Sequence, residues 1–384
     1  IRVSISATDV QPSEWFFEVR ASPLDIQSSD ANILLVLGDG SRFGPYYAEI
    51  LRAEGFTTFA SIPAAALESA NLATYQKLIV AGALGPASLE KVKTWVEAGG
   101  KLIAIRPTGA LAELAGIIST ESRVDGDGDL IIDTSQGPGK GLVEEPIQFH
   151  GPSDILLLGN GARALASVSV GSDRSPALTI VSVGDKGGEV AAFAFDLAQS
   201  VVLTRQGNPD WAGQERDGLA PIRPNDLFFG GAKSDPKADY VDLTRVHIPQ
   251  ADEQMRLLSN LILFLGRDRI PQPRFWYFPK DVKAVLVMAT DDHGTEDGTP
   301  RSFEHMLAAD APGCVVEQWE CARATSWTFL PTKLTNKQAL ALHKQGFDIG
   351  SHASTYCQNW SAESLARTFA TDLESFRVAF PDLA

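Results

Sequence analysis

Two adjacent carboxylates, Asp291 and Asp292, follow an apolar run at residues 284–290 and precede His293 and a glycine. The run has the length and composition of a buried strand, so the two acids are expected at its end. Like charges side by side at the mouth of a strand repel each other and lose hydration, and a bound cation or a proton relieves both effects. The pair is a candidate for metal binding or acid–base chemistry, with a solvated turn as the alternative.

A second strand-like run, residues 347–351, ends in His352. Side chains at the carboxyl ends of neighbouring parallel strands meet at one edge of a sheet. Carboxylate and imidazole are both ligands that zinc accepts in proteins. The two strand ends are therefore predicted to share one divalent metal ion, with zinc favoured and cobalt or another ion as alternatives.

The elements before these residues alternate, from residue 31, between apolar strand-like runs and amphipathic helix-like runs. This succession is typical of an open, doubly wound parallel sheet in an α/β protein. Later runs carry more strand and turn signals, and they are expected to extend the same sheet. Strands are expected at 33–37, 78–81, 102–105, 155–158, 177–183 and 190–195, and helices at 45–54, 88–98 and 251–265.

The run Pro271-Gln272-Pro273 marks a domain boundary. After it, helices are expected at 302–309, 337–345 and 361–379. The last has an apolar stripe at helical spacing that is expected to pack against the sheet. The stripe consists of Leu365, Phe369, Leu373 and Phe376.

Residues 96–106, Val-Glu-Ala-Gly-Gly-Lys-Leu-Ile-Ala-Ile-Arg, and residues 188–196, Gly-Glu-Val-Ala-Ala-Phe-Ala-Phe-Asp, resemble the class I glutamine amidotransferase-like group. The resemblance implies a flavodoxin-like domain over residues 31–270, with residues 1–30 as an extension or the tail of a preceding module. Active members use a cysteine nucleophile at a strand-to-helix elbow. Here no cysteine precedes Cys314, so glutaminase chemistry is excluded and a scaffold or binding surface is expected.

Residues 289–294, Ala-Thr-Asp-Asp-His-Gly, and residues 346–352, Gly-Phe-Asp-Ile-Gly-Ser-His, resemble the leading motifs of the polysaccharide deacetylase family, the carbohydrate esterase group with the NodB homology domain. The resemblance implies that residues 275–384 form the N-terminal half of a deacetylase-type (β/α) barrel. It further implies that Asp291 is the general base, and that Asp292 and His352 bind the metal. These implied roles fit the chemistry of hydrolysis, because a metal ion acidifies its bound water while an unliganded carboxylate takes the proton.

Some features depart from that family's pattern. Its third metal ligand is a histidine four residues after the first, and Tyr356 holds this position. Neutral tyrosine is a poor ligand, so the site must recruit Cys357, His293 or water, or else lose affinity for the metal. His293, directly after the aspartates, is a candidate ligand or proton carrier. The family's later motifs, including its general acid, would lie beyond residue 384, and the barrel needs about twice the residues present. The chain is therefore expected to be a fragment.

The chain has three cysteines, Cys314, Cys321 and Cys357. The first two are close enough in the sequence for a small disulfide loop, with two reduced, buried thiols as the alternative. A disulfide would place the protein in an oxidising compartment, outside the cell, at its surface or in a periplasm. In the simpler interpretation Tyr356 packs on the barrel rim and Cys357 is a structural half-cystine.

Composition excludes several classes of partner. With 384 residues, 44% of them hydrophobic, the chain is long enough for two domains with cores of their own. A net charge of -15 disfavours nucleic acid and anionic membrane surfaces. The longest apolar runs fall far short of the roughly 20 residues of a membrane helix, so no membrane-spanning segment is expected.

The sequence as a whole predicts a metal-dependent hydrolase that removes an acyl group from an amide or ester on a carbohydrate, with a carbon–nitrogen bond other than a peptide bond as the target. The alternative is a degenerate, noncatalytic deacetylase fold that binds a glycan or a surface partner.

Overall fold

The computed structural model describes residues 2–7, 10–16, 31–38, 40–124, 128–159, 161–170, 173–233, 239–268, 272, 274–275, 288–292, 297–355 and 361–383. The chain divides into two compact units. The first comprises Ile1–Gly207 and Val241–Phe275, and the second comprises Asn208–Tyr240 and Trp276–Ala384. The segment Asn208–Tyr240 thus belongs to the second unit, although the chain returns to the first unit after it.

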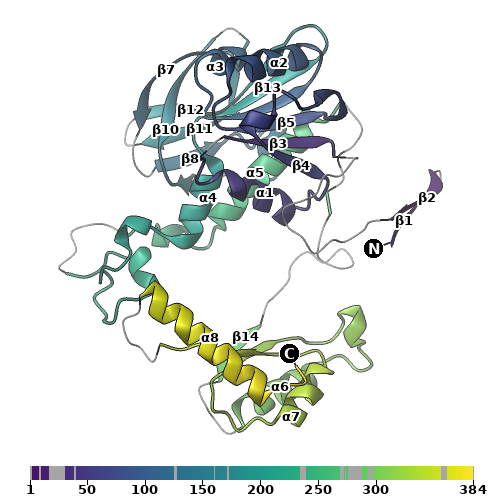
Figure 1. The fold of residues 1–384 in the computed structure, drawn as a ribbon, viewed down its shortest axis with the longest axis vertical. Helices are drawn as coiled ribbons and strands as arrows, with labels where there is room; N and C mark the ends of the chain where they lie inside the picture. The colour runs from purple at the N-terminus through teal and green to yellow at the C-terminus, as the bar shows by residue number, and fades with distance from the viewer. Residues whose placement is uncertain are drawn as a thin grey trace. The chain divides into compact units, whose positions relative to one another are not determined.

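A nine-stranded sheet forms the centre of the first unit among the described residues (Figure 1). Its spatial order is β4-β3-β5-β6-β13-β12-β11-β8-β9. Neighbouring strands are parallel from β4 to β13 and antiparallel from β13 to β9. The fold is therefore mixed α/β. The strands are β3 Ile33–Leu37, β4 Phe59–Pro63, β5 Lys77–Ala81, β6 Lys101–Ile105, β8 Gly128–Ile132, β9 Ile147–Phe149, β11 Arg163–Val170, β12 Asp173–Val183 and β13 Gly188–Phe193.

The parallel strands are apolar on both faces because helices cover both faces. In β3, Ile33 and Leu35 belong to one buried cluster, whereas Leu34 and Val36 belong to another. Helices α1, α4 and α5 contribute to the first cluster, and α2 and α3 contribute to the second. Alternate side chains of a strand point to opposite faces, so a doubly wound sheet requires this pattern. The helices are α1 Gly44–Ala53, α2 Pro86–Glu97, α3 Ala110–Leu114, α4 Leu197–Gln206 and α5 Gln250–Leu265.

One strand of this unit differs from the prediction. The strand expected at 155–158 is present as β10 (Ser153–Leu158), but it pairs antiparallel with β7 (Ile117–Val124) in a separate two-stranded sheet. The prediction that it extends the main sheet is wrong, because the apolar pattern of a strand does not specify its partner. β12 and β13 do join the main sheet. A further two-stranded antiparallel sheet consists of β1 (Arg2–Ala7) and β2 (Val10–Phe16).

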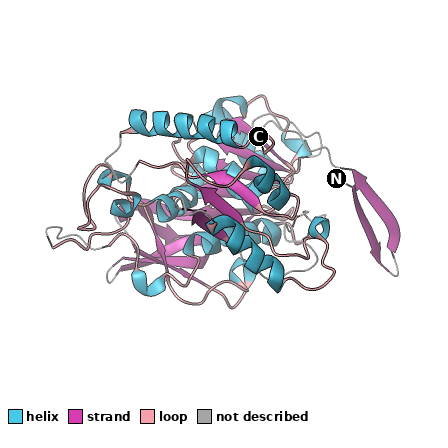
Figure 2. Cartoon of the chain, turned by 90° about the horizontal axis from the view of Figure 1, so that it is seen from below, coloured by secondary structure: helices cyan, strands magenta, loops and turns pink. Residues whose placement is uncertain are grey.

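Among the described residues of the second unit, three parallel strands form one sheet in the order β14-β15-β16. A helix follows each strand along the chain, and Figure 2 distinguishes these helices from the strands. Strand β15 was not foreseen from the sequence. The elements are β14 Ala289–Asp292, α6 Gly298–Ala309, β15 Thr325–Thr328, α7 Asn336–His343, β16 Asp348–Ser351 and α8 Ala362–Ala379.

The helices of the second unit cover one face of its sheet. Phe303 of α6 stacks on Phe347 with ring centroids 4.2 Å apart, and both side chains are fully buried. On the same face, Ile349 of β16 belongs to the cluster to which α6, α7 and α8 contribute, and the Ser326 hydroxyl is 2.7 Å from that of Thr299 in α6. Side chains at the alternate positions of the strands therefore point to the other face.

Helix α8 packs differently from the prediction. The helix is present, but Phe369 and Leu373 are 56% and 45% exposed, and of the predicted stripe only Phe376 is buried. The position that turns inward between them is Asp372, which is half-buried. The helix is turned about its axis relative to the predicted packing, because the carboxylate of Asp372 accepts a hydrogen bond from Ser354 in the loop after β16. No helix among the described residues, α8 included, is long and apolar enough to span a bilayer.

Candidate metal centre

Asp291 lies within β14, where it pairs with Trp327 of β15, and Trp327 pairs in turn with Gly350 of β16. Because the strands are parallel and in register, the side chains of this row share one face of the sheet. It is the face opposite the helices, since the alternate positions face the buried cluster. Asp291 is exposed and 43% of Trp327 is exposed, so this face is open to solvent at the site.

His352 directly follows β16, and its backbone N–H donates to the carbonyl of Thr328 at 3.0 Å. Its Nε2 is 3.8 Å from Oδ2 of Asp291. Strands β14 and β16 are not neighbours in the sheet, so the expectation of adjacent strands is wrong, and β15 lies between them. The two side chains nevertheless approach each other at the carboxyl edge of the sheet.

The separation of Asp291 and His352 is too long for a direct bond between the two side chains. At 3.8 Å the two atoms are too far apart for a hydrogen bond. An imidazole nitrogen is a ligand that zinc accepts in proteins. A carboxylate this close to it could take a proton from a water molecule on such an ion. The two described side chains therefore fit one ligand and the base of a divalent metal centre.

Other predicted site residues lie outside what the structure describes. Asp292 is described in its backbone as the last residue of β14, where it pairs with Thr328. Its side chain is not among the described parts, and neither are His293, Tyr356 and Cys357. Their assignments as ligands stay predictions.

Two aromatic side chains that the motifs did not indicate lie at the site. The ring centroid of Phe329 is 5.7 Å from that of His352. The indole of Trp327 lies across Gly350, where a Cβ would come within 2.5 Å of the ring. A glycine inside a strand marks such a close approach, so Gly350 was the available signal for a bulky neighbour on this face.

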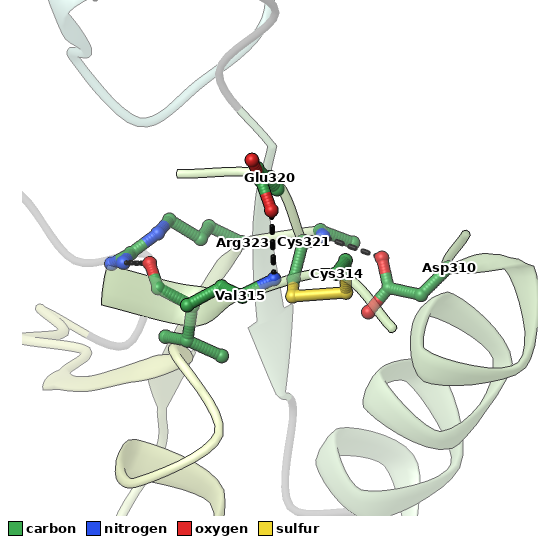
Figure 3. Close-up of a disulfide and its surroundings, with 8 residues drawn as sticks. Asp310, Cys314, Val315, Glu320, Cys321 and Arg323 are labelled. Atoms are coloured by element: carbon green, nitrogen blue, oxygen red, sulfur yellow. Dashed lines mark hydrogen bonds between the residues drawn. A yellow bond between two sulfur atoms is a disulfide. The ribbon is translucent and has the colours of Figure 1, made fainter. Parts of the chain in front are cut away.

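A disulfide joins Cys314 to Cys321, which is the pairing expected from the sequence (Figure 3). The disulfide lies within the connection between α6 and β15, which enters β15 at the end away from His352. Around it, Asp310 accepts a hydrogen bond from the N–H of Ala322 at 2.6 Å, and the guanidinium of Arg323 lies 4.2 Å from the ring centroid of Trp319. Asp310 and the two sulfurs are close together, but disulfide sulfurs are not thiolates, which are the form of cysteine that binds metals.

The carboxylates of Glu215, Asp217 and Asp226 also lie close together. Burial would raise the pKa of Asp226, but the backbone N–H groups of Arg223, Arg216 and Asp217, at 2.7, 2.6 and 2.9 Å, outweigh it and hold that pKa below its ordinary value. The carboxylate is therefore occupied in fastening its own loop. This cluster has a structural explanation.

No protein-family model and no curated protein matches the chain. Among solved structures, it is similar to a β-galactosidase from Bacillus circulans sp. alkalophilus, with 14% identity and a TM-score of 0.35 over 46% of this chain and 31% of the galactosidase. It is similar to a cytoplasmic protein from Salmonella typhimurium, with 16% identity and a TM-score of 0.35 over 51% of this chain and 95% of that protein. A third is an exo-β-1,4-mannosidase from Opitutaceae bacterium strain TAV5, with 16% identity and a TM-score of 0.34 over 46% and 33%. The chain thus spans about a third of each glycosidase, and TM-scores this low carry no argument about fold or function.

Proposed function

We propose that the second unit belongs to a metal-dependent hydrolase of the polysaccharide deacetylase type, which removes an acyl group from an amide or ester on a carbohydrate. The observation that carries the proposal is the 3.8 Å approach of Asp291 and His352, which come from the two segments that resemble the leading motifs of that family. Parallel strands in sequence order, each followed by a helix, support the assignment of these residues to part of a (β/α) barrel.

In this proposal Asp292 and His352 would hold zinc or another divalent metal ion. Such an ion would acidify a water molecule and polarise the acyl carbonyl. Asp291, whose side chain is 49% exposed, takes the proton from water as the water oxygen bonds to the acyl carbon. The bond from that carbon to the amine nitrogen or alcohol oxygen then breaks, the leaving group takes up a proton, and the acyl group departs as a carboxylic acid.

For the first unit we propose a flavodoxin-like scaffold or binding domain without glutaminase chemistry. Numbered along the chain, the five parallel strands that the structure describes in it have the order 2-1-3-4-5, which is the flavodoxin order. Arg106 follows β6 with a positive φ of 47°, and its guanidinium donates to both carboxylate oxygens of Asp154, at 3.0 and 2.6 Å. An arginine held in an ion pair supplies no nucleophile at this position, the strand-to-helix elbow where active amidotransferases carry their cysteine. The disulfide of the second unit supports an oxidising location, outside the cell or in a periplasm.

The metal assignment is tested by calorimetric titration of the metal-free protein with Co²⁺ and Zn²⁺. His352→Ala removes a ligand and is expected to weaken binding by at least about 100-fold, because outer-shell changes alone cost about 10- to 100-fold. His343→Ala is the matched control, since His343 is an exposed histidine whose Nδ1 is 3.3 Å from Asp348. Absence of binding in the unaltered protein, or equal affinity in both variants, contradicts the proposal.

The noncatalytic alternative is favoured by one observation, the exposed indole of Trp327 on the face that carries Asp291 and His352. An exposed aromatic face offers apolar area and a polar handle to a ligand. We expect Trp327→Ala to weaken binding of an N-acetylated sugar oligomer by about 5- to 10-fold, which corresponds to the roughly 1 kcal/mol of an aromatic contact. Fluorescence titration with and without a chelator separates the functions. Sugar binding that is unchanged by the chelator, with no release of acetate, would favour the binding protein over the hydrolase.

A further inference from the structure

Asp372 of α8 contacts the chain on both sides of His352. Its Oδ2 accepts a hydrogen bond from the backbone N–H of Ser354 at 3.1 Å. Its backbone carbonyl oxygen is 3.5 Å from the hydroxyl of Ser351, which donates to it. The short segment from Ser351 to Ser354, with His352 inside it, is therefore fastened to one residue of the helix.

The sequence context of Asp372 is unusual for a helix interior. Aspartate competes for backbone hydrogen bonds and disfavours helix interiors. The neighbouring Thr371, Leu373 and Glu374 are exposed, whereas Asp372 is half-buried and turns toward the sheet. An apolar side chain would be expected at an inward position of an amphipathic helix. The hydrogen bond to Ser354 is the feature of the structure that accounts for a carboxylate here.

Asp372 and the segment from Ser351 to Ser354 lie at a small hollow. Asp372, Ser354, Ser351 and His352 line this hollow together with Phe329 and Leu330. Residues 352–355 have no regular secondary structure. The backbone N–H of His352 binds the carbonyl of Thr328 on one side, and the Asp372 carboxylate holds the loop at Ser354 on the other.

We propose that Asp372 is a positioning residue of the metal centre: it holds the loop after β16 so that Nε2 of His352 faces Asp291. This inference rests on the proposed function, and it assigns to α8 a role outside the strand motifs. Groups that orient a metal ligand are commonly worth about 10- to 100-fold in metal affinity. Asp372 acts through the backbone of the loop and does not touch the ion.

The test compares Asp372→Ala, Asp372→Asn and Glu374→Ala by Co²⁺ calorimetry. Asparagine keeps an oxygen that accepts from the Ser354 N–H, whereas alanine does not. Asp372→Ala is expected to lose about 10- to 100-fold in affinity, and Asp372→Asn and Glu374→Ala are expected to stay within about twofold of the parent. Equal affinity in all three variants would overturn the positioning role. So would equal losses in the alanine and asparagine variants, because the charge and not the hydrogen bond would then be responsible.

A second readout separates this inference from the proposed function. Amide hydrogen exchange of Ser354 in the metal-free protein reports the hydrogen bond itself. Protection that falls in Asp372→Ala and returns in Asp372→Asn, together with the matching loss of Co²⁺ affinity, supports the inference. If the parent binds no Co²⁺, the metal site and its positioning residue are both rejected, even if the protection of the Ser354 amide still depends on which residue stands at position 372. If the parent binds Co²⁺ but neither protection nor affinity responds to Asp372→Ala, the metal site stands and the positioning role is rejected.

Discussion

Asp291→Asn is expected to lower the rate of acetate release from an N-acetylated sugar oligomer by about 10²- to 10⁴-fold, the contribution of a general base. The substitution keeps the shape of the side chain but replaces the basic carboxylate, which accepts the proton of water, with a neutral amide that does not. As the base is not a ligand in this assignment, Co²⁺ affinity is expected to stay within about twofold. Rate is measured by acetate release and affinity by calorimetry on the same preparation.

The control for Asp291 is another exposed carboxylate of the second unit. Asp297 is 62% exposed and pairs with Arg301 at 3.5 Å, so Asp297→Asn is expected to leave rate and affinity unchanged. The 3.8 Å distance to His352 also makes Asp291 geometrically able to bind the ion. Loss of Co²⁺ affinity in parallel with the rate would assign Asp291 as a ligand. An unaltered rate would remove it from the chemistry.

The succession of strands and helices was predictable where burial is repetitive. β3, β5 and β6 are fully or almost fully buried, and their apolar runs predicted them to within a residue at each end. Strand partners were less predictable. β10 has the apolar content of a main-sheet strand but pairs with β7, because pairing depends on long-range geometry that a local pattern does not contain.

The candidate site was predictable only in part. The strand ends that carry Asp291 and His352 were recognisable because polar groups follow apolar runs there. The intervening β15 was not recognised, since its four residues, Thr-Ser-Trp-Thr, include just one apolar side chain. Asp372 was also missed. Helical spacing favours Leu373 as the inward position, whereas the hydrogen bond to Ser354 selects Asp372.

A charged cluster lies at the amino edge of the first unit's sheet and is expected to contribute strongly to the stability of that unit. Lys101 of β6 pairs with Glu189 of β13, and their side chains are 2% and 10% exposed. Nζ of Lys101 is 2.8 Å from Oε2 of Glu189, and Arg267 binds Oε1 at 2.6 Å. Burial would raise the pKa of Glu189, but the hydrogen bonds and charges of Arg267 and Lys101 outweigh it and hold that pKa below its ordinary value.

Glu189→Ala is expected to lower the free energy of unfolding of the first unit by about 3–5 kcal/mol, because it leaves the buried ammonium of Lys101 without its buried partner. Amide exchange in β6 measures the loss. Asp268→Ala is the matched control. Asp268 also contacts Lys101, at 3.1 Å, but its side chain is 47% exposed, so a loss of about 1 kcal/mol or less is expected.

The same carboxylate makes the stability of the first unit depend on pH. Because the folded state holds Glu189 with a lowered pKa, the unfolded chain binds its proton more readily, and stability rises with pH. The contribution is complete above the unfolded pKa of about 4.3 and is lost as the pH falls through the lower folded pKa. In Glu189→Ala the unfolding free energy of this unit should therefore change less between about pH 5 and pH 3 than in the parent. Equal pH slopes in the two proteins would mean that Glu189 is not held ionised by Lys101 and Arg267, and the expected loss of 3–5 kcal/mol would no longer have its physical basis.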